Sequence, residues 1–345
     1  MGCPPPPPGS DSAAAAPMRI VFMGTPALAA HILDRLIAAS GRDFVVVAVV
    51  TRPDQPRNRG MKRESSEVAA VAARHQIPTL KPAKIRTPEF LAELKSFAPD
   101  LLVVAAYGRI LPNAVLAAPR IMPLNVHASM LPRHRGAAPI EGAIIAGDRE
   151  SGVTIMRVVE RMDAGPILLQ RSLPLAADET QGSLKDKLAE LGASALLETL
   201  AILRHGPLPE IPQDENLATY TAPIKKEDSI IDWSADAARV ERMIRAFDPW
   251  PVARTTLAGA DLLIWRARVA GESAPPGESA PPGESAPPGE SAPPGAILRL
   301  KPAPIVKCGV GSLALIEVQA AGRRRMAAAE FFRGRRSEPG ARLGQ

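Results

Sequence analysis

The first two thirds of the chain alternate between short apolar runs and segments whose apolar residues recur at helical spacing. The apolar runs, which predict strands, lie at residues 18–24, 44–51, 101–107, 153–159 and 167–175. The segments that predict helices lie at residues 67–75, 88–95 and 182–204. Apolar runs that alternate with helices are typical of βαβ units, in which both faces of a parallel sheet are covered. We therefore predict an α/β fold with a Rossmann-like parallel sheet in an N-terminal domain, residues 18–205.

The pattern changes after residue 205. Residues 206–225 are rich in Pro and polar side chains, which predicts a linker between two domains. Beyond it, an amphipathic helix with Val240 and Ile244 on its apolar face is followed by several short strand-like runs. Their length and spacing predict a smaller C-terminal β-barrel domain of the OB-like kind, residues 226–345.

Two segments have compositions that cannot build a core. Residues 1–17 are rich in Pro and Ala, and four copies of Gly-Glu-Ser-Ala-Pro-Pro fill residues 271–294. We predict a disordered extension at residues 1–17 and a flexible insertion in one loop of the barrel. A Pro-rich docking peptide is the functional alternative for the insertion.

The charge of the chain is concentrated at its C-terminal end. The whole chain of 345 residues has a net charge of +6, and residues 297–345 alone hold ten Lys and Arg against three Asp and Glu. This segment, which includes Arg323, Arg324 and Arg325, favours a polyanionic partner, either a nucleic acid or an anionic membrane.

Other features narrow the class of protein. No apolar run reaches the roughly eighteen residues that a membrane span requires. Cys3 and Cys308 lie in unrelated contexts, so the sequence indicates neither a disulfide framework nor a zinc cluster. We expect a cytoplasmic protein without a metal, and a monomer.

The candidate chemistry lies at the end of an apolar run. Asn125 and His127 are two residues apart in an extended segment, so their side chains point to the same side. Asp163 follows in a loop between two predicted strands, where a carboxylate can orient a histidine. Each of these residues taken alone is more often structural than catalytic, but together they suit acyl transfer to an amine. The Asn amide can donate to the developing oxyanion, the imidazole can accept a proton, and Asp163 would fix its tautomer and favour its protonated form.

The stretch Asn125-Val-His127-Ala-Ser129-Met-Leu131-Pro132, with Asp163 downstream, resembles the signature of the folate-dependent formyltransferases. The resemblance implies that Asn125, His127 and Asp163 are the catalytic triad and that 10-formyltetrahydrofolate is the formyl donor. The wider family includes enzymes that act on glycinamide ribonucleotide and on sugar amines. Five further segments resemble the branch that formylates methionyl-tRNA: Met23-Gly-Thr-Pro26, Arg135-Gly-Ala-Ala-Pro139, Ser151-Gly-Val-Thr-Ile155, Ile231-Asp-Trp-Ser234 and Ile244-Arg-Ala-Phe-Asp-Pro-Trp-Pro251. This branch implies initiator Met-tRNA as the partner.

The resemblance also implies binding residues. The implied folate pocket comprises Tyr107, Gly108, Ile110, Leu111 and Pro112, together with Ser129, Met130, Leu131 and Pro132. Arg59 and Lys62 match basic positions of the family's substrate loop near the tRNA acceptor end, and Arg323 to Arg325 add basic charge in the C-terminal domain. The chain departs from the family at His134, where an aromatic residue is usual.

Two alternatives stay open. A formyltransferase that acts on a sugar amine can share both domains. A non-catalytic RNA-binding protein would explain the basic C-terminal segment but would leave Asn125, His127 and Asp163 without a role. A dinucleotide-dependent oxidoreductase is disfavoured because Gly24-Thr-Pro-Ala-Leu-Ala replaces the Gly-x-Gly-x-x-Gly fingerprint.

Overall fold

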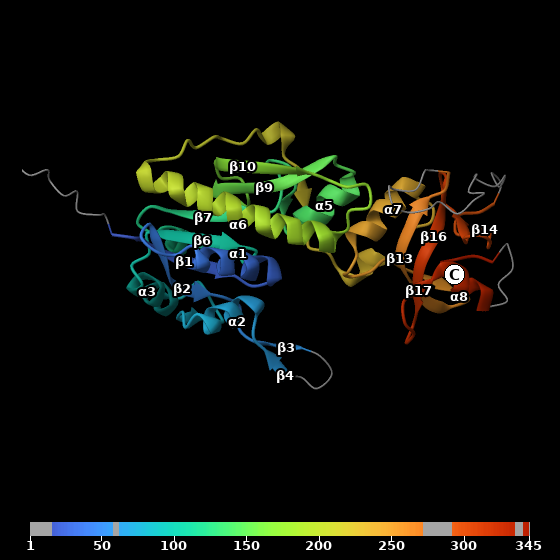
Figure 1. The fold of residues 1–345 in the computed structure, drawn as a ribbon, viewed down its shortest axis with the longest axis horizontal. Helices are drawn as coiled ribbons and strands as arrows, with labels where there is room; N and C mark the ends of the chain where they lie inside the picture. Colours follow the sequence, from blue (N-terminus) through green and yellow to red (C-terminus); the bar gives the residue numbers. More distant parts are fainter. Residues whose placement is uncertain (1–15, 58–61, 272–291, 335–340, 345) are drawn as a thin grey trace, which may run out of the picture. The chain divides into compact units, whose positions relative to one another are not determined.

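The computed structural model describes residues 16–57, 62–271, 292–334 and 341–344 (Figure 1). The chain divides into two units. The first comprises Met1–Tyr107, Leu111–Leu124 and Leu197–Leu208, and the second comprises Gly108–Ile110, Asn125–Leu196 and Pro209–Gln345.

Parallel strands and their covering helices make up the first unit. β1 (Met18–Gly24) pairs in parallel with β2 (Phe44–Val50) and β6 (Leu101–Ala105), and β2 pairs in parallel with β5 (Thr79–Leu80). The helices are α1 (Ala27–Ala38), α2 (Glu67–Arg74), α3 (Pro88–Ser96) and α4 (Asn113–Leu116). A short hairpin joins β3 (Gln55–Arg57) and β4 (Lys62–Glu64). All residues of β6 are buried, as expected for a strand with both faces covered.

The central sheet has seven strands in the order β10-β9-β7-β6-β1-β2-β5. β7 (Met122–His127) precedes the candidate catalytic loop, and β9 (Glu150–Arg157) pairs antiparallel with β10 (Ile167–Pro174). The predicted strands and the Rossmann-like sheet are confirmed, with an antiparallel pair at one edge. The remaining elements of this part are β8 (Arg135–Gly136), α5 (Pro139–Ala146) and α6 (Gln181–His205).

The segment predicted to be a linker contains short elements of its own. They are η1 (Glu215–Leu217) and β11 (Tyr220–Thr221), and η2 (Lys226–Ser229) begins directly after the predicted linker. β11 pairs in parallel with β8, so this segment contacts the loop that follows the candidate catalytic strand.

The C-terminal part folds around an antiparallel sheet with strand order β12-β13-β16-β15-β14, in which β17 also pairs with β16 (Figure 1). The strands are β12 (Arg254–Leu257), β13 (Ala260–Val269), β14 (Ile297–Arg299), β15 (Ile305–Lys307), β16 (Ser312–Ala320) and β17 (Met326–Ala327). α7 (Ala237–Ala246) and α8 (Ala328–Gly334) add Val240, Ile244 and Phe332 to its core.

The C-terminal residues close this sheet toward a barrel. The Leu343 amide donates to the Gly295 carbonyl at 2.8 Å, and the Gly344 amide donates to the Thr256 carbonyl at 2.9 Å. Residues near the chain end therefore bridge β12 and the start of β14, which confirms the predicted small barrel. Most of the repeat at 271–294 and of the extension at 1–17 lies outside the described residues. Among the residues that the structure does describe, no helix is long and apolar enough to cross a membrane.

Candidate active site

The second unit brings Asn125, His127 and Asp163 together. Asn125 and His127 lie at the end of β7, and Asp163 lies in the loop between β9 and β10. The Asn125 amide nitrogen is 3.5 Å from Asp163 Oδ1, and His127 Nδ1 is 3.8 Å from the same oxygen. The His127 side chain is 6% exposed and that of Asp163 is 16% exposed. Of the two titratable side chains, that of His127 is therefore the more deeply buried.

The carboxylate of Asp163 is held by a backbone amide. The Gly136 N–H donates to Asp163 Oδ2 at 2.8 Å, so the two carboxylate oxygens face different partners. Gly136 has φ of +110°, and a Cβ at this position would lie 2.2 Å from the Thr221 carbonyl oxygen. Only glycine allows this approach, and a larger residue would displace the donor of the carboxylate.

The orientation of His127 is set by a backbone carbonyl. His127 Nε2 lies 3.0 Å from the carbonyl oxygen of His134. Because a carbonyl only accepts, Nε2 carries the proton, and the lone pair of the neutral ring is on Nδ1, which faces Asp163. The prediction that Asp163 fixes the tautomer is therefore wrong, since 3.8 Å is too long for a hydrogen bond.

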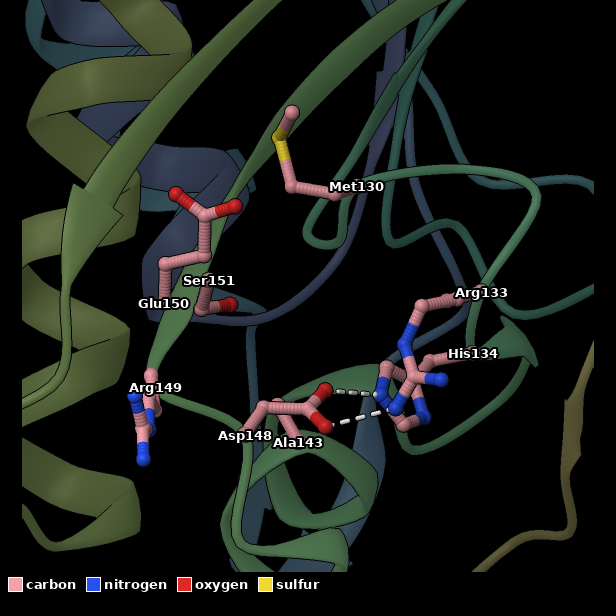
Figure 2. Close-up of a pocket in the computed structure, with 8 residues that line it drawn as sticks. All are labelled: Met130, Arg133, His134, Ala143, Asp148, Arg149, Glu150 and Ser151. Atoms are coloured by element: carbon pink, nitrogen blue, oxygen red, sulfur yellow. Dashed lines mark hydrogen bonds and ion pairs between the residues drawn. The ribbon is translucent and has the colours of Figure 1, made fainter.

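His134, whose carbonyl binds His127, is itself fixed through its side chain and its backbone amide. Figure 2 shows Arg133 and His134 converging on Asp148, beside a cavity of about 190 Å³. His134 Nε2 lies 2.7 Å from Asp148 Oδ2, and Arg133 Nη2 lies 2.5 Å from Asp148 Oδ1. The His134 amide donates to Thr219 Oγ1 at 2.8 Å, and its φ is +57°. An imidazole at this position can bind a carboxylate, which a phenyl ring could not do, so the departure from the family supplies an anchor.

The loop at residues 129–132, which includes part of the implied folate pocket, is fixed by one buried hydroxyl. Thr154 Oγ1 donates to the Ser129 carbonyl at 2.7 Å and accepts from the Leu131 amide at 3.1 Å. Gln170 Nε2 donates to the Leu131 carbonyl at 2.8 Å. Leu131 packs with Met156 in a small buried cluster. Ser129 and Leu131 are buried, while Met130 and Pro132 are partly exposed.

The other implied folate residues are divided between the two units. Tyr107, Leu111 and Pro112 belong to the first unit, and Gly108 and Ile110 belong to the second, as the trio does. Tyr107 and Leu111 are buried, whereas Ile110 is 65% exposed. Gly108 has φ of +73°, and Pro112 precedes α4.

The predicted tRNA contacts differ in how far the structure describes them. Arg59 lies outside the described residues, and Lys62 begins β4. Arg323, Arg324 and Arg325 are exposed between β16 and β17. Arg325 forms an ion pair with Glu317, and its guanidinium lies 4.7 Å from the centroid of the Trp265 ring. The Arg325 charge is therefore partly neutralised, while Arg323 and Arg324 lie at the surface.

Sequence reasoning missed several residues that build the site. Gly136, Arg135 and Thr154 lie in motifs named above but had no assigned role, and Gln213 carried no local signal. Their partners are distant in the sequence, so only the tertiary structure identifies them. Within the parts of the chain that are described, no group of three His, Cys, Asp or Glu side chains could hold a metal ion.

Comparisons with known proteins agree with the geometry. The family described as Formyl transferase matches residues 18–200, and the Formyl transferase, C-terminal domain, matches residues 223–336. The methionyl-tRNA formyltransferase of Geobacter sulfurreducens is 43% identical over 331 residues, which cover 96% of this chain and 98% of that protein. That of Thiobacillus denitrificans is 46% identical and covers 95% of this chain and 100% of its own.

A solved structure shares the fold at low identity. The sugar 3N-formyl transferase WlaRD, crystallised with dTDP and 5-N-formyl-THF, has a TM-score of 0.59 and 15% identity. The match covers 89% of this chain and 99% of that one. The chain therefore shares the fold of that protein over most of its length.

Proposed function

Because the chain belongs to the methionyl-tRNA formyltransferase family, we infer that formyl transfer is its reaction and that three side chains carry it out. These side chains are Asn125, His127 and Asp163. The protein is a formyltransferase that acts on methionyl-tRNA. We propose 10-formyltetrahydrofolate as its donor, initiator Met-tRNA as its acceptor, and a monomer in the cytoplasm as its working form. The observation that carries the assignment is the convergence of an amide, an imidazole and a carboxylate within 3.8 Å.

The reaction moves a formyl group between two nitrogens. The donor supplies an N-formyl group, whose bond to the donor nitrogen breaks as the carbon bonds to the methionine amine. The amine loses one proton, and the departing nitrogen gains one. Negative charge develops on the formyl oxygen during this exchange, so the site must offer a hydrogen-bond donor and a group that moves a proton.

The three side chains meet these needs. The Asn125 amide has two N–H groups, and the one directed at Asp163 orients the other toward the formyl oxygen. His127 accepts the amine proton at Nδ1, because Nε2 is already bound to the His134 carbonyl. Asp163 stabilises the imidazolium that forms, and the proton then passes to the departing nitrogen. No Ser or Cys nucleophile is needed, since the amine attacks directly.

The residues implied to bind folate include both apolar side chains and backbone polar groups, which a flat heterocycle requires. In the second unit, the apolar side chain of Leu131 lies in the loop that the resemblance assigns to folate and can contact one face of the ring. Backbone amides and carbonyls of the two implied segments can bind its polar edge. Ser129 is engaged by the Arg133 carbonyl at 2.7 Å, so its hydroxyl fixes the loop and leaves recognition to the backbone.

The test is a formylation assay on purified protein with 10-formyltetrahydrofolate. Initiator Met-tRNA, elongator Met-tRNA and a nucleotide-linked amino sugar are the three acceptors. We expect formylation of initiator Met-tRNA, and no product with the amino sugar. Product with the amino sugar alone would overturn the acceptor assignment.

The catalytic roles are tested by substitution. Asn125→Ala should lower kcat by about 10²- to 10³-fold, the cost of losing one oxyanion donor. His127→Ala should lower kcat by about 10²- to 10⁴-fold, the contribution of a positioned proton-transfer group. His75→Gln is the control, because His75 lies in the first unit and pairs with Asp34. Near-normal turnover of the His127 variant would refute the assignment.

A further inference from the structure

The segment that joins the two domains packs against the catalytic loops. Ile167 and Ile211 exchange two backbone hydrogen bonds, at 2.8 and 2.9 Å. Tyr220 and Thr221 pair in parallel with Arg135 and Gly136. Residues 209–221 are thus fixed at both ends to the elements that carry Asp163 and its donor Gly136, and we call them the strap.

Gln213 lies in the middle of the strap and binds the backbone of the Asp163 loop. Its Nε2 donates to the carbonyl of Asp163 at 2.8 Å and to the carbonyl of Gly165 at 2.7 Å. Its Oε1 accepts from Arg135, whose Nε and Nη2 lie 3.0 and 2.8 Å away. Arginine only donates and carbonyls only accept, so this network allows a single orientation of the amide.

The Asp163 loop has a backbone that needs such support. Asp163 has φ of +49°, a left-handed conformation that is unfavourable for a residue with a side chain. At Gly165 a Cβ would lie 1.8 Å from the Arg157 carbonyl oxygen, so the loop is tightly confined there. The two carbonyls bound by Gln213 are those of the strained residue and of this confined glycine.

Arg135 fixes the side-chain amide of Gln213 by donating to its oxygen. Its side chain is fully buried, and Nη1 and Nη2 also lie 3.1 and 3.0 Å from the two carboxylate oxygens of Glu215. Glu215 forms a second ion pair with Arg161, which is in the Asp163 loop. Hydrogen bonding to Arg135 lowers the pKa of Glu215, so the pair stays charged around neutral pH. The strap therefore binds the loop through both Gln213 and Glu215.

We propose that Gln213 is a positioning residue for formyl transfer, which holds the Asp163 backbone so that its carboxylate faces Asn125 and His127. The proposal rests on the proposed function, because it assigns Gln213 a role through Asp163. The amide of Gln213 binds Arg135 and the backbone carbonyls of Asp163 and Gly165, so its role is to position Asp163. Gln213 thereby links the segment between the domains to the loop that carries Asp163.

The test uses the full chain with Gln213→Glu. Glutamate keeps an acceptor for Arg135, so folding is retained, but it loses both donors and places an oxygen against two carbonyls. We expect kcat to fall by about 10- to 100-fold, as for a displaced catalytic group, with KM for Met-tRNA changed less than about threefold. Gln213→Met serves if the first variant fails to fold. Asn216→Ala is the matched control in the strap, because its side chain bonds only within the strap to Asp214, and it should keep wild-type turnover.

A double-mutant cycle with Asp163→Asn separates positioning from general destabilisation. Rates are measured in single turnover with excess enzyme, so that slow variants remain measurable. If Gln213 acts through Asp163, Gln213→Glu should cost less than about threefold once Asp163 has lost its charge. The full cost in both backgrounds would overturn the proposal. Full activity of Asp163→Asn would instead refute the proposed triad, and full activity of Gln213→Glu beside an inactive Asp163→Asn would refute only the positioning role.

Discussion

Thr154→Val isolates the contribution of one buried hydroxyl to the loop at residues 129–132. The Thr154 side chain is fully buried, and its Oγ1 bonds the Ser129 carbonyl, the Leu131 amide and Gln170 Nε2 at 2.7, 3.1 and 2.9 Å. Valine has nearly the same shape, so the substitution removes the polar contacts without opening a cavity. The Gln170 amide keeps its bond to the Leu131 carbonyl, whereas the Leu131 N–H loses its acceptor.

The expected loss of stability follows from the Leu131 N–H that is left without an acceptor. A buried amide without a partner costs about 1–3 kcal/mol, and the lost bond to Ser129 adds about 1 kcal/mol. We expect the free energy of unfolding to fall by about 2–4 kcal/mol. Because the loop belongs to the implied folate pocket, KM for the folate donor should rise about tenfold, which corresponds to about 1.4 kcal/mol of binding.

Urea denaturation followed by circular dichroism measures the first effect, and initial rates at varied donor concentration measure the second. Thr154→Ser is the control, because it keeps the hydroxyl and loses only a methyl group, at a cost of about 1 kcal/mol. A valine variant that is as stable as the serine variant would show that the hydroxyl does not hold the loop. An unchanged KM for the folate donor in a destabilised valine variant would show that the loop at residues 129–132 does not contribute to folate binding.

Three further predictions concern other parts of the chain. Arg135→Met should lower the free energy of unfolding by about 1–3 kcal/mol, because Gln213 Oε1 loses its donors while the half-exposed Glu215 keeps its ion pair with Arg161; calorimetry would show this as a lower Tm, and an unchanged Tm would contradict it. Burial raises the pKa of the Cys308 thiol to about 12. In a Cys3→Ser variant, Cys308 of the native protein should therefore not react with a thiol reagent at pH 8, while one thiol per chain should react in urea-unfolded protein. Stability should also decrease as pH rises above about 8.5, because the unfolded thiol ionises there while the native thiol stays protonated until about pH 12. Deletion of residues 271–294 should leave kcat within about twofold, since a low-complexity repeat adds no core; a larger loss would give the repeat a role.

Most of the fold could be predicted from local patterns. The strands β1, β2, β6, β9 and β10 and the helix α6 appeared as apolar runs or helical periods in the sequence, whereas the short strands β3, β4, β5 and β8 gave no such signal. The antiparallel direction of β10 left no comparable signal, because the direction of a strand depends on its pairing with β9 and not on its own composition. The closure of the barrel by residues 341–344 also depended on partners far away in the chain.

The candidate site also contains residues that the sequence could predict and residues that it could not. The spacing of Asn125 and His127 put both side chains on one face of a strand, and a family signature linked Asp163 to them. Their supports could not be predicted, because each is a contact between residues that the sequence separates widely: the His134 carbonyl on His127, the Gly136 amide on Asp163, and Gln213 on the Asp163 loop.

The sequence by itself therefore determined which main elements form and which side chains are candidates for the chemistry, since periodicity and residue type are local properties. Only the tertiary structure decided which nitrogen of His127 binds the His134 carbonyl and which residues contact Asp163 and its loop. Hydrogen bonds depend on positions to within a few tenths of an ångström, and chain folding alone sets those positions.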